Sequence, residues 1–154
     1  MNISKYMKRK VVSIPATSTI RDAASVLSKN HIGLLPIVDT NQKLVGVVGM
    51  RDLLSLVLPD FVSFVADVDF VHDFGAVEKT RPPAEVLDQP ITTLMKIAIT
   101  VPEDSGLLRT YSLMLQHNLH VIPVVSADGK LAGVASRVDI GAAILSTWVE
   151  VESK

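Results

Sequence analysis

The most constraining feature of the sequence is an internal duplication. Residues 14–53 and 101–140 align without a gap at an offset of 87 positions. Ten pairs of residues are identical in this alignment: Pro15 and Pro102, Ser18 and Ser105, Ser25 and Ser112, Pro36 and Pro123, Val38 and Val125, Lys43 and Lys130, Leu44 and Leu131, Gly46 and Gly133, Val47 and Val134, and Asp52 and Asp139. Two copies in one chain predict two similar units that bury apolar faces against each other.

Each copy predicts the same order of elements, strand, helix, strand, strand and helix, from the spacing of its apolar and turn residues. In the first copy the expected elements are Val11–Ile14, Ile20–Asn30, Leu34–Val38, Leu44–Val48, and Met50 to about Leu58. In the second copy they are Ile97–Val101, Ser105–His117, Val121–Val125, Leu131–Ala135, and Arg137 to about Val149. The predicted fold class is therefore α+β, with repeat 1 at residues 1–58, an insertion and linker at 59–90, and repeat 2 at 91–154.

The segment between the copies has no counterpart in either of them. Its first half, Phe61–Phe74, holds all four phenylalanines of the chain, and Pro82 and Pro83 then break regular structure. We expect a partly helical excursion followed by an extended linker, and we regard the segment as a candidate interaction surface.

The composition excludes several classes of protein. Fifteen basic residues against sixteen acidic ones give a net charge of −1, so a broad nucleic-acid-binding face is not expected. The absence of cysteine excludes disulfides, thiol catalysis and thiolate metal sites. The longest apolar stretch, Leu53–Val71, includes Asp60, Asp67 and Asp69 and is too polar to cross a bilayer. We therefore expect a soluble, cytoplasmic protein that binds neither nucleic acid nor membrane.

The stretch from Gly133 to Asp139 predicts a strand that runs directly into a helix, and it has two interpretations. In a capping box, the Ser136 hydroxyl accepts from the backbone amide of Asp139, while the carboxylate of Asp139 reaches back to the amide of Ser136. In a ligand site, the start of the helix attracts a phosphate, the hydroxyl donates a hydrogen bond, and the carboxylate holds a ribose diol. This stretch alone leaves both interpretations open, and capping is the commoner use.

The two repeats resemble a tandem pair of cystathionine β-synthase (CBS) domains, also called a Bateman module. Each has a hydrophobic-Pro-hydrophobic-Val strand and a Leu-x-Gly strand that closes on Asp, and the resemblance covers about residues 5–58 and 91–150. It implies two halves related by pseudo-twofold symmetry and, for a stand-alone pair, a homodimer. It also implies that an adenosine-containing ligand (AMP, ADP, ATP or S-adenosylmethionine) binds between the halves, with no required cofactor. Such a module is regulatory, typically energy-sensing, and here it would act on an effector protein in trans.

The resemblance also assigns binding residues. The family's Gly-x-x-[Ser/Thr]-x-x-Asp ribose-phosphate motif is complete only in the second copy, at Gly133, Ser136 and Asp139. In the first copy Gly49 takes the hydroxyl position, which leaves Asp52 for a ribose and Arg51 for a phosphate. The resemblance implies Val12, Ile32, Gly33 and Leu34 for the Asp139 site, and Ile99, Leu119 and Val121 for the Asp52 site. It also implies that His120, three residues before Pro123, contacts a phosphate, and Val134 and Arg137, which lie next to the motif residues Gly133 and Ser136, are further candidates. Lys8, Arg9 and Lys10 either face a polyphosphate or are solvated.

Two other classes of function compete with a nucleotide sensor. An enzyme is not expected, because the chain lacks the phosphate-binding loop, the His-Glu-x-x-His motif and the Gly-x-Ser-x-Gly motif. The remaining constellation is Asp67, Asp69, His72 and Asp73, whose spacing does not place all four on one helical face, so a solvated acidic surface is favoured over a metal site. The second alternative is a ligand-free structural module that only dimerises.

Overall fold

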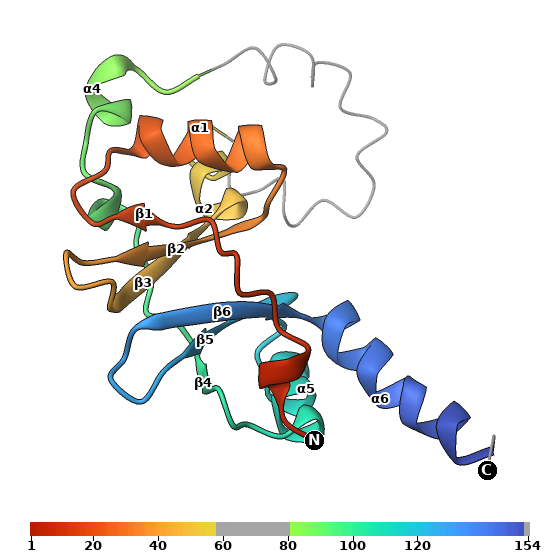
Figure 1. Cartoon of the computed structure of the whole chain (residues 1–154). Helices are drawn as coiled ribbons and strands as arrows, with labels where there is room; N and C mark the ends of the chain where they lie inside the picture. The colour runs from red at the N-terminus through yellow and green to blue at the C-terminus, as the bar shows by residue number, and fades with distance from the viewer. Residues whose placement is uncertain (58–80, 153–154) are drawn as a thin grey trace, which may run out of the picture.

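The computed structural model describes residues 1–57 and 81–152, which form two halves with one three-stranded sheet each (Figure 1). The first sheet has the order β1-β2-β3, with β1 at Ile14–Pro15, β2 at Leu34–Val38 and β3 at Leu44–Gly49. The second has the order β4-β5-β6, with β4 at Val101–Pro102, β5 at Val121–Val125 and β6 at Leu131–Ser136. The predicted α+β fold with two repeats is confirmed.

Both sheets have the same pairing pattern. The first strand of each runs parallel to the second, and the second pairs with the third as an antiparallel hairpin. Pro36 lies opposite Val47, and Pro123 lies opposite Val134. The strands are rich in β-branched residues, which suit a pleated and half-buried surface. The duplicated sequence thus produces duplicated backbone pairing.

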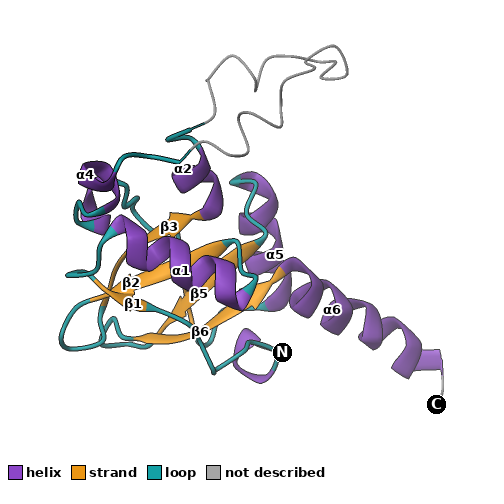
Figure 2. Ribbon diagram, turned by 90° about the horizontal axis from the view of Figure 1, so that it is seen from above, coloured by secondary structure: helices purple, strands orange, loops and turns teal. Residues whose placement is uncertain are grey.

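Helices cover the sheets (Figure 2). The α-helices are α1 at Ile20–Asn30, α2 at Met50–Leu54, α4 at Ala84–Leu87, α5 at Leu107–Gln116 and α6 at Arg137–Glu152. Two short 3-10 helices, η1 at Ile3–Lys5 and η3 at Ile91–Thr93, each precede a first strand. In the described part of the chain, no helix is long and apolar enough to cross a membrane.

The start of α1 is a complete capping box. The hydroxyl of Thr19 accepts from the backbone amide of Asp22 at 3.1 Å, and the carboxylate of Asp22 accepts from the backbone amide of Thr19 at 2.9 Å. The hydrogen bonds from the backbone and the side chain of Thr19 lower the pKa of Asp22, because they favour its charged form. The helix ends at His31, which adopts a left-handed conformation with φ of 52°.

Each half has its own apolar core, but the two repeats exchange their leading segments. Ile3 and Met7, from the start of the chain, belong to the core of the second half. Ile91, which precedes the second repeat, belongs to the core of the first half. Ile3 and Ile91 are both completely buried. Each hydrophobic core is therefore completed by the other repeat's leading segment, and the two halves form one interdependent unit.

Backbone hydrogen bonds fix this exchange at matching places. Lys8 and Val134 exchange two bonds of 2.8 and 3.0 Å, and Lys96 and Val47 exchange two bonds of 2.9 and 2.8 Å. Gly133 and Gly46 allow these approaches: a Cβ on Gly133 would lie 2.7 Å from the carbonyl oxygen of Lys8. Glycine is required here because there is no room for a side chain.

Several predicted boundaries were wrong, for identifiable reasons. The strand expected at Val11–Ile14 is confined to Ile14–Pro15, and that at Ile97–Val101 to Val101–Pro102. The preceding residues carry the chain from one sheet to the other, since Lys8 pairs with the second half and Ile14 with the first. A strand ladder cannot continue across that gap.

The helices also differ in length from the prediction. The helix expected to reach Leu58 ends at Leu54, where Ser55 caps it, and the helix expected to end near Val149 continues to Glu152. The helix expected at Ser105–His117 is shorter and spans Leu107–Gln116, because Ser105 and Gly106 form the entry to the helix. The predicted extended linker contains α4, a single turn that begins directly after Pro83. The predicted helical excursion at Phe61–Phe74 and its acidic residues lie outside the described residues.

Candidate functional site

The end of β6 and the start of α6 place Ser136 and Asp139 as the sequence predicted, in a capping box. The hydroxyl of Ser136 accepts from the backbone amide of Asp139 at 3.0 Å. Oδ2 of Asp139 accepts from the backbone amide of Ser136 at 3.1 Å. This pair stabilises the first turn of a 16-residue helix, whose N-terminus favours a negative charge.

Capping leaves part of the Asp139 carboxylate unused. Oδ1 of Asp139 has no hydrogen-bond partner among the described residues, and no described cation lies within 4.0 Å of the carboxylate. The Asp139 residue is half-buried rather than fully exposed to solvent. One acceptor oxygen at the start of α6 is therefore available to a ligand, such as the hydroxyls of a sugar.

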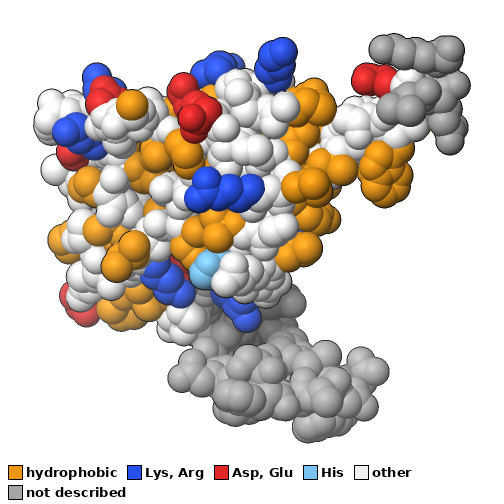
Figure 3. Space-filling model, turned by 90° about the horizontal axis from the view of Figure 1, so that it is seen from below, with side chains coloured by type: hydrophobic (Ala, Val, Ile, Leu, Met, Phe, Trp, Pro, Cys, Tyr) orange, Lys and Arg blue, Asp and Glu red, His pale blue; other side chains and the backbone are white. Residues whose placement is uncertain are grey.

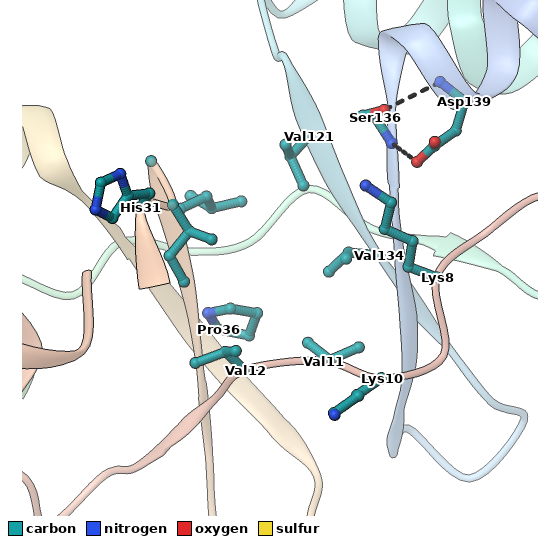
Figure 4. A pocket seen from close by; sticks show the side chains of 13 residues that line it. Lys8, Lys10, Val11, Val12, His31, Pro36, Val121, Val134, Ser136 and Asp139 are labelled. Atoms are coloured by element: carbon teal, nitrogen blue, oxygen red, sulfur yellow. Dashed lines mark hydrogen bonds between the residues drawn. The ribbon is translucent and has the colours of Figure 1, made fainter. Parts of the chain in front are cut away.

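A cavity of about 310 Å³ lies between the two halves, and Asp139 is one of the residues that line it (Figure 4). The second half contributes Val121, Val134, Ser136 and Asp139, and the first half contributes the start of the chain and the approach to β2. The residues from the first half are Lys8, Lys10, Val11, Val12, His31, Ile32, Gly33, Leu34 and Pro36. An apolar wall thus faces a polar end, which is the usual composition of a small-molecule site.

Two basic side chains line the cavity, and Lys8 is the one near Ser136 and Asp139 (Figure 4). Lys8 and Lys10 line it, and neither forms an ion pair with a described carboxylate. Figure 4 shows the Lys8 side chain extending from its loop toward Ser136 and Asp139. The position of that loop is fixed by the two backbone hydrogen bonds between Lys8 and Val134. The cavity therefore combines a free carboxylate oxygen with unpaired positive charge.

The equivalent position in the first half is arranged differently. Oδ2 of Asp52 accepts from the backbone amide of Gly49 at 2.8 Å, as Asp139 does from Ser136. Oδ1 of Asp52, however, forms an ion pair of 2.6 Å with the ammonium group of Lys96. Gly49 has no hydroxyl, and α2 has only five residues. Both oxygens of this carboxylate are therefore occupied within the chain.

Comparison with known proteins identifies the family. The sequence model described as "CBS domain" matches residues 3–59 and 84–146, which together make up most of the chain. The chain belongs to the CBS domain family. The duplication, the paired sheets and the crevice between the halves are therefore those of a pair of CBS domains, and this prediction is confirmed.

Two curated relatives are CBS domain-containing proteins of Arabidopsis thaliana, both described as chloroplastic. The protein CBSX2 is 33% identical over 147 residues, which cover 90% of this chain and 60% of the relative. The protein CBSX1 is 29% identical over 155 residues, which cover 93% of this chain and 64% of the relative. This chain therefore spans a little under two thirds of the length of these relatives.

Solved structures agree in fold. A crystal structure of CBSX2 in complex with AMP matches with a TM-score of 0.70 and 26% identity, covering 95% of this chain and 97% of the other. A CBS domain protein from Pyrobaculum aerophilum complexed with AMP matches with a TM-score of 0.66 and 29% identity, covering 90% of this chain and 89% of the other. Both of these structures are complexes with AMP.

Most residues that the resemblance assigned to the Asp139 site lie together. The cavity wall includes Asp139, Ser136, Val134, Val12, Ile32, Gly33 and Leu34. Arg137 and His120 do not line it. The guanidinium of Arg137 donates to the carbonyl of Leu119 at 2.6 Å and to Asn118 at 3.3 Å, and the backbone amide of Arg137 donates to the carbonyl of His120 at 3.0 Å. These contacts hold the start of β5 against the start of α6.

The residues assigned to the Asp52 site are more scattered. Ile99 and Leu119 pack against the core of the second half, and Arg51 is exposed. Val121 lines the Asp139 cavity, because its backbone pairs with Ser136 at the end of the β5-β6 hairpin, and its assignment to the Asp52 site stays a prediction. Among the described residues, no group of three or more side chains could hold a metal ion. The constellation of Asp67, Asp69, His72 and Asp73 lies outside the described residues.

Sequence reasoning missed His31 and Val11 on the cavity wall and left Lys8 and Lys10 undecided. It also missed the pairing of Lys96 with Asp52. A signal was present: the dipeptide Met-Lys occurs at 7–8 and again at 95–96, an offset of 88 rather than 87. One extra residue between Lys8 and the first strand hides this equivalence in an ungapped alignment.

Proposed function

We propose that this CBS pair is a regulatory module that binds an adenine nucleotide (AMP, ADP or ATP) in the cleft between its halves. The observation that carries the proposal is the carboxylate of Asp139, which lines a cavity of about 310 Å³ and uses only Oδ2 in the capping box. That volume lies at the lower end of the range of roughly 300–1,000 Å³ for small-molecule sites. The capping box and the ligand site are compatible, since each uses a different carboxylate oxygen.

Each part of a nucleotide has a matching group in the cavity. A ribose diol can donate to the free oxygen of Asp139, and the apolar wall formed by Val12, Ile32 and Leu34 suits the face of a base. Gly33 has no atom within 4 Å of the place where a Cβ would stand, so the backbone there is open to a base edge. Phosphates would meet the start of α6.

The charge of the cavity favours nucleotides over S-adenosylmethionine. Lys8 and Lys10 attract a phosphate group, whereas they repel the positive sulfonium of S-adenosylmethionine. The related structures of CBSX2 and of the Pyrobaculum aerophilum protein are both complexes with AMP. S-adenosylmethionine and a ligand-free structural role remain the alternatives to exclude.

The regulatory output would be a shift between two arrangements of the halves. A nucleotide that touches both halves binds their closed arrangement better than an open one, so occupancy biases the equilibrium. An effector protein acting in trans would read this change, and energy sensing is the corresponding role. We propose no catalytic activity for the chain itself. The predicted cytoplasmic location stays a prediction, and the two plant relatives are chloroplast proteins.

A homodimer is part of the proposal, and α6 supports it. Val138, Ala142, Leu145 and Val149 follow one another at spacings of four, three and four residues, and all are exposed. Trp148 beside them is 66% exposed. Figure 3 shows hydrophobic side chains along the projecting end of α6. A helix with so much exposed apolar surface is typical of one that is buried in an assembly, and a second copy offers the same stripe.

Thermal unfolding with AMP, ADP, ATP, S-adenosylmethionine and Mg²⁺ tests the proposal. A ligand that binds only the folded state stabilises it by about 2.7 kcal/mol at a hundredfold excess over Kd. We expect AMP or ATP to raise the midpoint, Asp139→Ala to remove most of this shift, and Asp52→Ala to remove less of it.

The matched control is Asp22→Ala, which breaks the equivalent capping box of α1 far from the cavity. It should lower the stability of the unliganded protein much as Asp139→Ala does, yet preserve the nucleotide shift. Unchanged midpoints with every ligand would favour the structural role. A larger loss in Asp52→Ala than in Asp139→Ala would place the nucleotide in the other half.

A further inference from the structure

The two halves contain the same carboxylate in the same local frame, but with different second partners. Oδ2 accepts from the backbone amide three residues earlier in both, at 3.1 Å for Asp139 and 2.8 Å for Asp52. Oδ1 of Asp139 has no partner among the described residues, whereas Oδ1 of Asp52 is bound by Lys96 at 2.6 Å. The proposed ribose contact needs the second carboxylate oxygen. This difference therefore decides which half can bind a ribose through its aspartate.

Lys96 is the structural counterpart of Lys8. Each lysine exchanges two backbone hydrogen bonds with the central valine of the other repeat's last strand, Lys8 with Val134 and Lys96 with Val47. Each lysine follows a methionine that packs beside a glycine of that strand: Met7 lies beside Gly133, and Met95 lies beside Gly46. The two side chains therefore start from equivalent points, yet only the ammonium group of Lys96 lies within 4.0 Å of a carboxylate at the helix start.

The two side chains of the Lys96–Asp52 ion pair differ in their exposure to solvent. The side chain of Lys96 is 69% exposed, whereas that of Asp52 is 15% exposed. A largely exposed lysine thus contacts a carboxylate that is mostly enclosed in the folded chain. A sugar hydroxyl that approached Oδ1 of Asp52 from solvent would have to displace an ammonium group, and a charged donor makes a stronger bond to a carboxylate than a neutral hydroxyl does.

We propose that Lys96 closes the first half to nucleotide, so that each chain binds one nucleotide, at Asp139. The inference rests on the proposed function and specifies its stoichiometry. Lys96 acts as an internal counter-ion that replaces the ribose, and Lys8, from the equivalent position, leaves its carboxylate open and faces the ligand. The duplicated sequence therefore produces one ligand site, at Asp139, and one equivalent position, at Asp52, whose carboxylate is paired with Lys96.

Isothermal titration with AMP tests this inference in the full-length chain. The wild type should bind one AMP per chain, and Asp139→Ala should lose most of this binding. Adding Lys96→Met to Asp139→Ala keeps the aliphatic stem but removes the charge, and it should restore saturable binding. Adding Lys96→Arg instead should not restore it, because the positive charge remains. A further Asp52→Ala change should abolish the restored binding.

Each alternative result is decisive. Two AMP molecules per wild-type chain, or equal behaviour of Asp139→Ala with and without Lys96→Met, would overturn the role of Lys96 while leaving the proposed function intact. No binding by the wild type would overturn the proposed function itself, and this inference with it. Because Lys96 is largely exposed, Lys96→Met is expected to fold, and Lys96→Gln provides a second neutral variant whose thermal midpoint checks the fold.

Discussion

The backbone amide of Ile3 donates to the carbonyl of Ser105 at 2.9 Å, which attaches the first turn of the chain to the second repeat. Ile91 makes the matching bond to Ser18 at 2.8 Å in the other half. The side chain of Ile3 follows its backbone into the core of the second half and is completely buried. The start of the chain is therefore a structural part of a repeat that begins some ninety residues later.

We predict that Ile3→Ala lowers the free energy of unfolding by about 2–5 kcal/mol, because it removes buried methyl groups and leaves a cavity. Urea unfolding followed by circular dichroism measures the change. Ile97→Ala is the matched control, since Ile97 is 95% exposed and its truncation should leave stability almost unchanged. A loss below about 1 kcal/mol for Ile3→Ala would contradict the packing of the leading segment.

Ser136→Gly should separate stability from ligand binding. Glycine is tolerated at helix starts, so the loss of stability should be only a few tenths of a kcal/mol. Nucleotide affinity should fall at least fivefold, because the variant copies the arrangement at Gly49 and removes the hydroxyl from the cavity wall. Titration calorimetry measures the affinity. Thr19→Gly makes the same change at the start of α1 and should leave affinity unaltered; an equal loss in both variants would argue against a ligand role for Ser136.

Lys8→Met should weaken binding in proportion to the charge of the ligand. The variant keeps most of the aliphatic chain but loses the positive charge that faces the cavity, so ATP should lose more affinity than AMP, and adenosine should lose little. The difference should shrink as salt is raised, because ions screen exposed charges. Lys29→Met, at the end of α1, is the control for a general change in net charge. Equal losses for all three ligands would show that Lys8 acts by packing rather than by charge.

Leu145→Glu should disrupt the proposed homodimer and leave a monomer. The substitution places a charge in the centre of the exposed stripe on α6, where burial against a second copy would leave it unpaired. Sedimentation velocity measures the mass of the particle. Ile97→Glu changes an even more exposed apolar residue outside α6 and should not alter the association state. A wild-type monomer, or a dimer that persists in Leu145→Glu, would contradict the role assigned to this helix.

The sequence predicted those features of the fold that depend on local patterning. The first hairpin, formed by Leu34–Val38 and Leu44–Gly49, was predicted because apolar strands flank a short polar turn. The helix at Ile20–Asn30 has the predicted bounds because Thr19 and His31 cap its ends. The duplication then predicted the second half from the first. The first strands were overestimated because β propensity at Val11 and Val12 does not reveal that the chain there crosses between sheets.

The candidate site was predictable where one repeat's motif determines it and less so where both repeats contribute. Ser136 and Asp139 follow from the spacing of a capping box. The partner of Asp52 does not, because Lys96 reaches it only through the exchange of leading segments, which brings together residues 44 positions apart. Such a contact depends on the arrangement of the halves in space, and residue spacing within one repeat contains no information about it.

The backbone pairing of Lys96 with Val47, and of Lys8 with Val134, has a further consequence for the two outer strands. β3 and β6 lie at the borders of their sheets, where unsatisfied amides and carbonyls can recruit strands from other molecules into aggregates. Each of these borders is covered in the middle by a residue from the opposite repeat. The same contacts that hold the repeats together thus protect the edge strands against aggregation with strands of other molecules. Truncation of the N-terminal segment that carries Lys8 should therefore lower the solubility of the protein.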